Sequence, residues 1–250
     1  MQPVEYDLKT VMGLIDYTLL KAFATEEDVK RLIDEAVVFG NAAVCIEPVH
    51  LNFARDYIDR GNLDIKIDVV LDFPFGASFT SARKELVDLY SGKADEIDIV
   101  SPIALVKSGR LDSVESDINE LVKAAHRNNR VIKVIAEDAY TTEAEKRKLY
   151  AMVCKSGADF IKTCTGFEDK SYSESLGNKT GAQTANIGLM AEIADRYNPE
   201  IGIKASGGVR TYAQVKELIE ASRREALPSR FRIGASGVAK IREEIPSTAK

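Results

Sequence analysis

The 250-residue sequence predicts a single (β/α)8 barrel, an α/β fold, over residues 1–250. Short apolar segments rich in β-branched residues alternate with helical segments, and eight of each fit within the chain. This leaves about 30 residues for each βα unit, which is the usual size of that motif and the usual length of such a barrel. With 45% hydrophobic residues, the chain can also build a substantial core.

Near-continuous apolar segments of four or five residues are typical of parallel strands that are buried on both faces. Seven clear segments and a weaker N-terminal one are present: 43–46, 67–71, 97–100, 131–135, 160–163, 201–204 and 231–234, with 12–16 as the weaker strand. A doubly wound open sheet is the alternative, and it predicts a glycine-rich phosphate loop after the first strand. The segment after that strand, Tyr17-Thr18-Leu19-Leu20, has no glycine, which favours the barrel.

The first long helix shows how the helical segments are recognised. Thr25 is a suitable N-cap, acidic residues follow it, and apolar residues then recur at helical spacing until Gly40. Similar patterns predict helices near 49–60, 79–92, 113–125, 142–156, 185–197, 211–222 and 237–245.

Composition and charge exclude several classes of function. The net charge is −5 and no basic block occurs, so a nucleic-acid partner has no electrostatic support. No apolar run approaches the length of a membrane span, and the N-terminus does not resemble a secretory signal. Three widely spaced cysteines suit the reducing cytoplasm, where we expect the protein. Two histidines are too few for a His-rich metal site, which argues against a zinc-dependent reaction.

Lysines occupy the middle of three consecutive predicted strands, at Lys133, Lys162 and Lys204. An unpaired charge between the sheet and the helices is very costly, so these side chains should point into the barrel. Asp16 and Asp98 lie in other strands and supply opposite charges there. Buried positive charges disfavour one another, which keeps an amine neutral and nucleophilic toward carbonyls. The sequence therefore indicates Schiff-base chemistry, with an interior salt-bridge layer as the alternative.

Glycine-rich turns follow the last two predicted strands. Gly207 and Gly208 come after the seventh strand, and Gly234 and Ser236 come after the eighth, just before a short helix. Barrels often bind phosphate with these two loops, because glycines let backbone N–H groups approach an anion and a helix start favours negative charge. We therefore expect a phosphate site at these turns.

A long polar connection at about 167–184 follows the sixth predicted strand. Connections in βα units usually have about 2–6 residues, so this loop is either a functional lid or a tolerated surface insertion.

The sequence resembles the deoxyribose-phosphate aldolase family. The matching segments occur in the family's order and cover nearly the whole chain: 14–18, 43–48, 73–76, 94–100, 133–137, 160–166 and 202–211. The resemblance implies a class I aldolase on a (β/α)8 barrel, with no cofactor, that reversibly cleaves 2-deoxy-D-ribose 5-phosphate to acetaldehyde and D-glyceraldehyde 3-phosphate. It implies Lys162 as the Schiff-base lysine, Lys204 as the activating cation and Asp98 as the acid–base partner.

The same resemblance implies roles for further residues and for the assembly. The expected substrate-binding residues are Asp16, Thr18, Cys45, Lys133, Thr163, Gly207, Gly208, Gly234 and Ser236. The expected partner is a small phosphosugar, and a homodimer is expected from the family. Two other functions stay open: a class I aldolase of the same fold that acts on a different phosphosugar or aldehyde, and a phosphate-binding barrel without Schiff-base chemistry.

Overall fold

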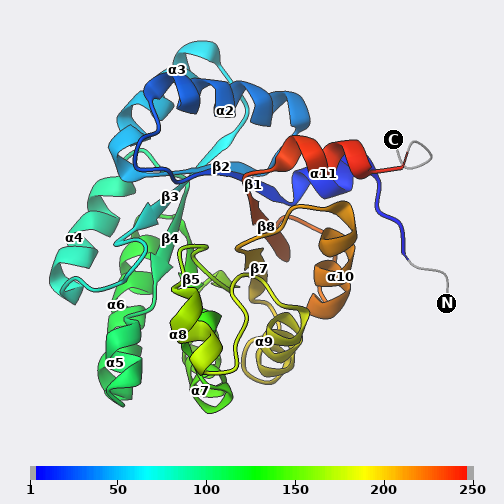
Figure 1. The fold of residues 1–250 in the computed structure, drawn as a ribbon. Coiled ribbons are helices and arrows are strands. Elements are labelled where there is room, and N and C mark those ends of the chain that lie inside the picture. Colours follow the sequence, from blue (N-terminus) through cyan, green and yellow to red (C-terminus); the bar gives the residue numbers. More distant parts are fainter. Residues whose placement is uncertain (1–3, 247–250) are drawn as a thin grey trace.

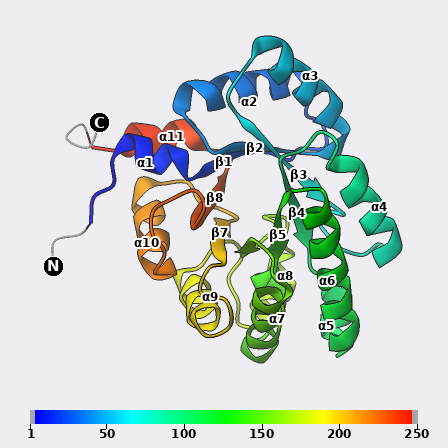
Figure 2. The same cartoon turned by 180° about the vertical axis from the view of Figure 1, so that it is seen from behind.

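A computed structural model of the chain describes residues 4–246, and its centre is a closed barrel of eight parallel strands (Figures 1 and 2). Each strand pairs with the next along the chain, and β8 pairs with β1 to close the barrel. The strands are β1 (Ile15–Leu19), β2 (Ala43–Ile46), β3 (Lys66–Leu71), β4 (Glu96–Val100), β5 (Val131–Ile135), β6 (Phe160–Lys162), β7 (Gly202–Ser206) and β8 (Phe231–Ala235). The fold is therefore the predicted (β/α)8 barrel.

At least one helix follows each strand and packs around the outside of the barrel (Figure 1). These helices are α2 (Glu26–Phe39), α3 (Leu51–Gly61), α4 (Thr80–Tyr90), α6 (Leu111–Arg127), α7 (Glu143–Ser156), α9 (Thr184–Tyr197), α10 (Tyr212–Ser222) and α11 (Val238–Glu244). The structure adds short elements that were not predicted: α1 (Leu8–Gly13), α5 (Ile103–Lys107), α8 (Lys170–Ser175), and the 3-10 turns η1 (Pro48–His50) and η2 (Asp138–Tyr140). Within residues 4–246, no helix combines the length and apolar character needed to cross a bilayer.

The termini of α2 confirm the sequence rules that predicted it. The Thr25 side chain accepts a hydrogen bond from the Asp28 N–H, and the Asp28 carboxylate accepts one from the Thr25 N–H. Gly40 ends the helix in the left-handed conformation. Its apolar stripe packs against β1 and β2, so the helix covers the part of the barrel from which Asp16 and Cys45 project.

The predicted first strand at 12–16 is wrong in its position. Met12 and Gly13 end helix α1, and β1 begins only at Ile15. The Asp7 side chain caps this helix by accepting the Thr10 N–H, and Met12 is buried in the core. A buried apolar helix of six residues cannot be distinguished from a strand by its apolar run alone. Asp16 nevertheless lies within β1, as expected.

Most of the apolar core lies between the barrel and its helices, and includes Val44, Ile67, Ile97, Ile161 and Ile203. These residues alternate along their strands with side chains that point into the barrel. The interior of this barrel is unusual because many of its side chains are charged, and this interior forms the candidate site.

Candidate active site

Strand register brings the interior charges side by side. Asp98 on β4 lies beside Lys133 on β5, and Lys162 on β6 lies beside Lys204 on β7. Paired residues of neighbouring strands point to the same face of a sheet. The resulting interior cluster contains four carboxylates and four cations: Asp16, Asp68, Glu96 and Asp98 with Lys133, Lys162, Lys204 and Arg232. Its formal charges balance, which is the condition under which buried charges are tolerable.

Lys204 makes three short ion pairs with carboxylates of the cluster. Its Nζ lies 2.6 Å from the Asp16 carboxylate, 2.8 Å from Asp68 and 2.7 Å from Asp98. The Asp98 oxygen that it contacts, Oδ2, also accepts a hydrogen bond from Lys162 Nζ at 2.6 Å. Lys162 and Lys204 are therefore linked through one carboxylate oxygen.

Lys133 and Arg232 are two further cations of the interior cluster. Lys133 Nζ lies 3.0 Å from Asp68, 2.8 Å from Glu96 and 3.0 Å from Asp98. The Arg232 guanidinium bridges Asp16 and Glu96, with contacts of 2.6 and 2.7 Å. Both side chains are buried, and their charged groups pair with carboxylates of the cluster.

The expectation that crowded lysines keep one another neutral is wrong for Lys133 and Lys204. Burial alone would lower the pKa of each, but the carboxylates around them reverse this and raise both pKa values above the ordinary lysine value. Burial alone would likewise raise the pKa of Asp98, yet Lys133, Lys162 and Lys204 hold it well below its usual range. Near neutral pH the interior therefore contains Asp98 as a carboxylate and Lys133 and Lys204 as ammonium groups.

Lys162 differs from the other two lysines because it reaches a cavity. Lys133 and Lys204 are 0% exposed, whereas Lys162 is 3% exposed and lines a cavity of about 530 Å³ at the carboxyl ends of the strands. An amine that touches both a buried carboxylate and a solvent-accessible cavity can meet a carbonyl compound while a proton acceptor lies within 2.6 Å.

The two glycine-rich turns lie on the wall of the same cavity. Gly207 and Gly208 line it from the loop after β7, and Gly234 and Ser236 line it from the end of β8 and the following turn. At Gly234, a side-chain Cβ would lie only 2.9 Å from the Ser206 Cβ, so this strand position requires glycine. The predicted phosphate turns and the predicted Schiff-base lysine thus face one cavity.

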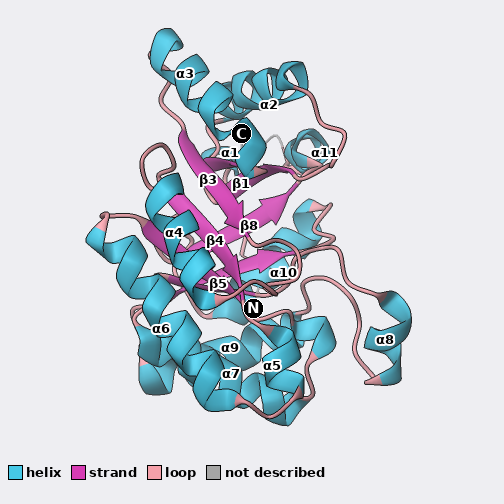
Figure 3. Ribbon diagram, turned by 90° about the vertical axis from the view of Figure 1, so that its left-hand side faces the viewer, coloured by secondary structure: helices cyan, strands magenta, loops and turns pink. Residues whose placement is uncertain are grey.

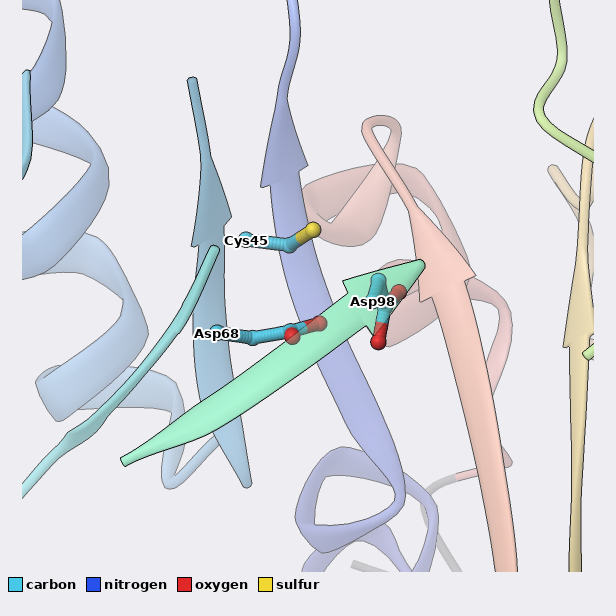
Figure 4. Close-up of side chains that lie close together, drawn as sticks. All are labelled: Cys45, Asp68 and Asp98. Atoms are coloured by element: carbon cyan, nitrogen blue, oxygen red, sulfur yellow. The ribbon is translucent and has the colours of Figure 1, made fainter. Parts of the chain in front are cut away.

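Cys45, Asp68 and Asp98 project toward one another from β2, β3 and β4 (Figure 4). Burial raises the pKa of the Cys45 thiol, and Asp68 raises it further, so the thiol stays protonated. Cys45 packs with Leu20, Val70 and Phe73 in a small apolar cluster above the carboxylates. It therefore forms an apolar wall beside Lys162's partner Asp98 and does not itself line the cavity surface.

Two predicted substrate-binding residues use their hydroxyl groups within the protein. Thr163 is fully buried, donates to the Ser206 carbonyl at 2.8 Å and accepts the Ser206 N–H at 2.9 Å. It therefore joins β6 to β7 rather than facing the cavity. Thr18 lines the cavity, although its hydroxyl donates to the Asp16 carbonyl.

Sequence reasoning missed Asp68, Glu96 and Arg232. Asp68 lies between Ile67 and Val69, and Arg232 lies between Phe231 and Ile233. These are charged residues in apolar strands, which is the same signal that identified the three lysines. Applied to every strand, that rule would have found Asp68 and Arg232, but not Glu96, which follows Asp95 and lies outside the predicted strand 97–100.

Within residues 4–246, two groups of residues have the donor atoms to hold a metal ion. Their ligand atoms lie within 4.8 Å of one another in each group, which consist of Cys45, Asp68 and Asp98, and of Glu137, Cys164 and Glu168. In the first group the carboxylates already pair with lysine ammonium groups, whose charge opposes a further cation.

The long loop at 167–184 contributes little to the wall of the cavity. Of its residues only Phe167 lines the cavity, where its ring packs against Phe73 with centroids 5.3 Å apart. Helix α8 within the loop projects at one end of the barrel (Figure 3). It is bound to η2 through the Asp169 N–H, which donates to the Tyr140 hydroxyl, and through Tyr172, which packs edge-on against Tyr140. In this structure the loop therefore leaves most of the cavity uncovered, and its role as a lid stays a prediction.

Glu137, which follows β5, is a buried acid with a measurable consequence for stability. Burial raises its pKa from an ordinary 4.5 to about 8, and the nearby charge of Glu168 adds to the effect. The folded state thus holds a proton that the unfolded chain releases above pH 4.5. The stability that this proton contributes is fully present below pH 4.5 and is lost as the pH rises to about 8.

We therefore expect Glu137→Gln to remove part of the decline in stability between pH 5 and pH 9. Urea unfolding midpoints of both proteins at these two values test this, with the exposed Glu243→Gln on α11 as control. At pH 9 the unfolding midpoint of Glu137→Gln should exceed that of wild type, and at pH 5 it should not. The midpoint of Glu243→Gln should equal that of wild type at both pH values. An equal effect of Glu137→Gln at both pH values would contradict the assignment.

A closed (β/α)8 barrel that directs a lysine amine and two glycine turns into one cavity has the construction of a barrel aldolase. The comparison with known families agrees, because the model of the DeoC/LacD family aldolases matches residues 4–245. The chain belongs to this family and is accordingly a lyase of the aldolase type.

Several individual proteins that this chain resembles are deoxyribose-phosphate aldolases. A deoxyribose-phosphate aldolase of Thermoplasma volcanium is 50% identical over 242 residues and 97% of each chain, and one of Thermococcus kodakarensis is 40% identical over 239 residues, covering 95% of this chain and 98% of its own. Among solved structures, a tetrameric deoxyribose phosphate aldolase of Aeropyrum pernix matches with a TM-score of 0.80 and 26% identity, over 96% of this chain and 92% of that one.

Proposed function

We propose that this aldolase reversibly cleaves 2-deoxy-D-ribose 5-phosphate to acetaldehyde and D-glyceraldehyde 3-phosphate through a Schiff base on Lys162. The observation that carries the proposal is the placement of Lys162, whose Nζ contacts Asp98 on one side and the cavity with the two glycine turns on the other. The names of the relatives support the same substrate.

In the proposed reaction, Lys162 Nζ attacks the aldehyde carbon C1 of the open-chain sugar. Loss of the carbonyl oxygen as water gives an iminium ion, which can accept the electron pair of the C2–C3 bond. Asp98, acting through a water molecule, removes the C3 hydroxyl proton, and glyceraldehyde 3-phosphate leaves. The remaining enamine is protonated at C2, and hydrolysis then releases acetaldehyde and the free lysine.

The interior cluster supports the removal of the C3 hydroxyl proton. Asp98 is held as a carboxylate, so it can accept a proton at the start of the cycle. The Lys204 ammonium lies 2.7 Å from the same Asp98 oxygen and balances its negative charge. General acid–base assistance of this kind contributes roughly 10²–10⁴-fold to a rate.

The phosphate of the substrate is proposed to bind at Gly207, Gly208 and Ser236, which line the same cavity as Lys162. None of the backbone N–H groups of Gly207, Gly208 and Val209 donates to a backbone carbonyl within the part of the chain that the structure describes. Such groups can converge on an anion. Asp16, Thr18, Cys45, Lys133, Thr163 and Gly234 are then assigned to shaping the cavity or holding the groups that line it.

The substrate is the phosphorylated sugar of a deoxynucleoside 5′-phosphate without its base, so we place the reaction in nucleoside catabolism and in the cytoplasm. All three cysteines are free thiols, which suits that compartment. The homodimer stays a prediction.

A coupled assay tests the proposal directly. Purified protein should release acetaldehyde from 2-deoxy-D-ribose 5-phosphate, and should form the sugar phosphate from acetaldehyde and D-glyceraldehyde 3-phosphate. A panel of other phosphosugars and aldehydes serves as the comparison. Turnover of a different phosphosugar with no cleavage of deoxyribose 5-phosphate would reject the substrate assignment while leaving the aldolase class intact.

A further inference from the structure

The C-terminal end of the long loop lies directly against the turn after β7. The Ala182 N–H donates to the Gly207 carbonyl at 2.9 Å. A Cβ at Gly181 would lie only 2.6 Å from the same carbonyl oxygen and 3.0 Å from its carbon. The backbone at 181–182 and the backbone at 207 therefore meet without room for one added methyl group.

This contact sets the orientation of one peptide group in the turn. A trans peptide is planar, and its N–H points opposite to its C=O. Because the Gly207 carbonyl points toward Ala182, the Gly208 N–H points away from the loop. Gly208 lines the cavity, and both glycines have positive φ, at 94° and 73°. Two adjacent glycines have little conformational preference of their own, so the turn depends on an outside contact for its shape.

The loop has a fixed anchor from which it can supply that contact. The Asn178 amide group donates to the carbonyls of Ala139 at 3.0 Å and Thr141 at 2.9 Å. Its oxygen accepts a hydrogen bond from Lys146 Nζ at 3.0 Å. The segment 178–182, which we call the strap, thus joins the loop after β5 to the turn after β7.

We infer that the strap positions the Gly207–Gly208 turn to bind the substrate phosphate, with Gly181 as the positioning residue. This inference rests on the proposed function, because it takes the turn as the phosphate site. A side chain at Gly181 would push against the Gly207 carbonyl, rotate the peptide group and turn the Gly208 N–H away from the phosphate. Lys162 and Asp98 lie on other strands and would be unaffected.

The chain contains a matched control for this position. Gly177 lies in the same loop with φ of 73°, against 74° for Gly181, but a Cβ there would meet nothing within 4 Å. Gly177→Ala and Gly181→Ala therefore impose the same backbone strain, and only the second adds an atom against the turn. A third variant, Asn178→Ala, releases the anchor of the strap without adding any atom.

The test compares KM and kcat for deoxyribose 5-phosphate with kcat/KM for unphosphorylated 2-deoxyribose. Loss of a hydrogen bond to a charged group corresponds to about tenfold in affinity or more. Gly181→Ala should raise KM for the phosphorylated sugar by about that factor, with kcat and the activity on 2-deoxyribose within about twofold of wild type. Asn178→Ala should shift KM in the same direction, and Gly177→Ala should not.

Binding of inorganic phosphate, measured by titration calorimetry, keeps the inference separate from the reaction. If wild type cleaves neither sugar, the proposed function fails, and weaker phosphate binding by Gly181→Ala than by Gly177→Ala would still support the strap. If Gly181→Ala does not fold, Asn178→Ala decides by the same readouts. The inference is overturned if neither Gly181→Ala nor Asn178→Ala differs from Gly177→Ala in KM for the phosphorylated sugar or in phosphate binding.

Discussion

Replacement of Lys162 by arginine should lower kcat/KM for deoxyribose 5-phosphate by about 10⁴-fold or more, in the range seen when a covalent nucleophile is removed. Arginine keeps a positive charge beside Asp98, so the balance of the interior cluster is preserved. Its guanidinium stays protonated at every practical pH and cannot form the Schiff base. The variant therefore removes the nucleophilic amine and keeps the positive charge.

Lys162→Met serves as the companion variant. It removes both the nucleophile and the charge, so it should lose activity to the same extent and also lose stability, because Asp98 keeps only Lys133 and Lys204 as partners. Steady-state kinetics and urea unfolding of both variants check this. Substantial activity in Lys162→Arg, at more than about one per cent of wild type, would show that the reaction does not pass through this amine.

Lys204→Leu has the second largest expected effect, a fall in kcat of roughly 10²–10⁴-fold near neutral pH. Lys204 shares Asp98 Oδ2 with Lys162, at 2.7 and 2.6 Å, and also contacts Asp16 and Asp68. Its removal leaves a surplus of buried negative charge, which favours the protonated, non-nucleophilic form of the neighbouring amine. The acidic limb of the pH–rate profile should therefore move to higher pH.

Lys133→Leu is the comparison for this prediction. Lys133 is equally buried and contacts Asp98 through the other oxygen, Oδ1, at 3.0 Å. Lys133→Leu should therefore lower the free energy of unfolding about as much as Lys204→Leu does, but should shift the pH–rate profile less. If the profile of Lys204→Leu coincides with that of wild type, or if the two leucine variants give the same shift, Lys204 has no special link to Lys162.

The fold was predictable because its two signals are local and repeated. Parallel barrel strands are buried on both faces, so their apolar runs are continuous, and caps such as Thr25 mark where the helices begin. The inward direction of Lys133, Lys162 and Lys204 was also predictable, because an unpaired charge between the sheet and the helices would be very costly.

Other parts of the site depend on partners that no local pattern reveals. The lysines were expected to lower one another's pKa, but the surrounding carboxylates, including the unpredicted Asp68, raise the pKa of Lys133 and Lys204. Thr163 resembles a binding residue in sequence, yet its hydroxyl is occupied by Ser206 of the next strand. The path of the long loop is set by Asn178 and its contacts with η2, about 40 residues away in sequence, which composition alone does not predict.

Borohydride trapping tests the central claim most directly. Protein is incubated with deoxyribose 5-phosphate or acetaldehyde, reduced with sodium borohydride, digested, and mapped by mass spectrometry. We predict a single adduct on Lys162, and none in Lys162→Arg. An adduct on Lys133 or Lys204, or no adduct under conditions in which the substrate is cleaved, would contradict the assignment of Lys162 as the Schiff-base lysine.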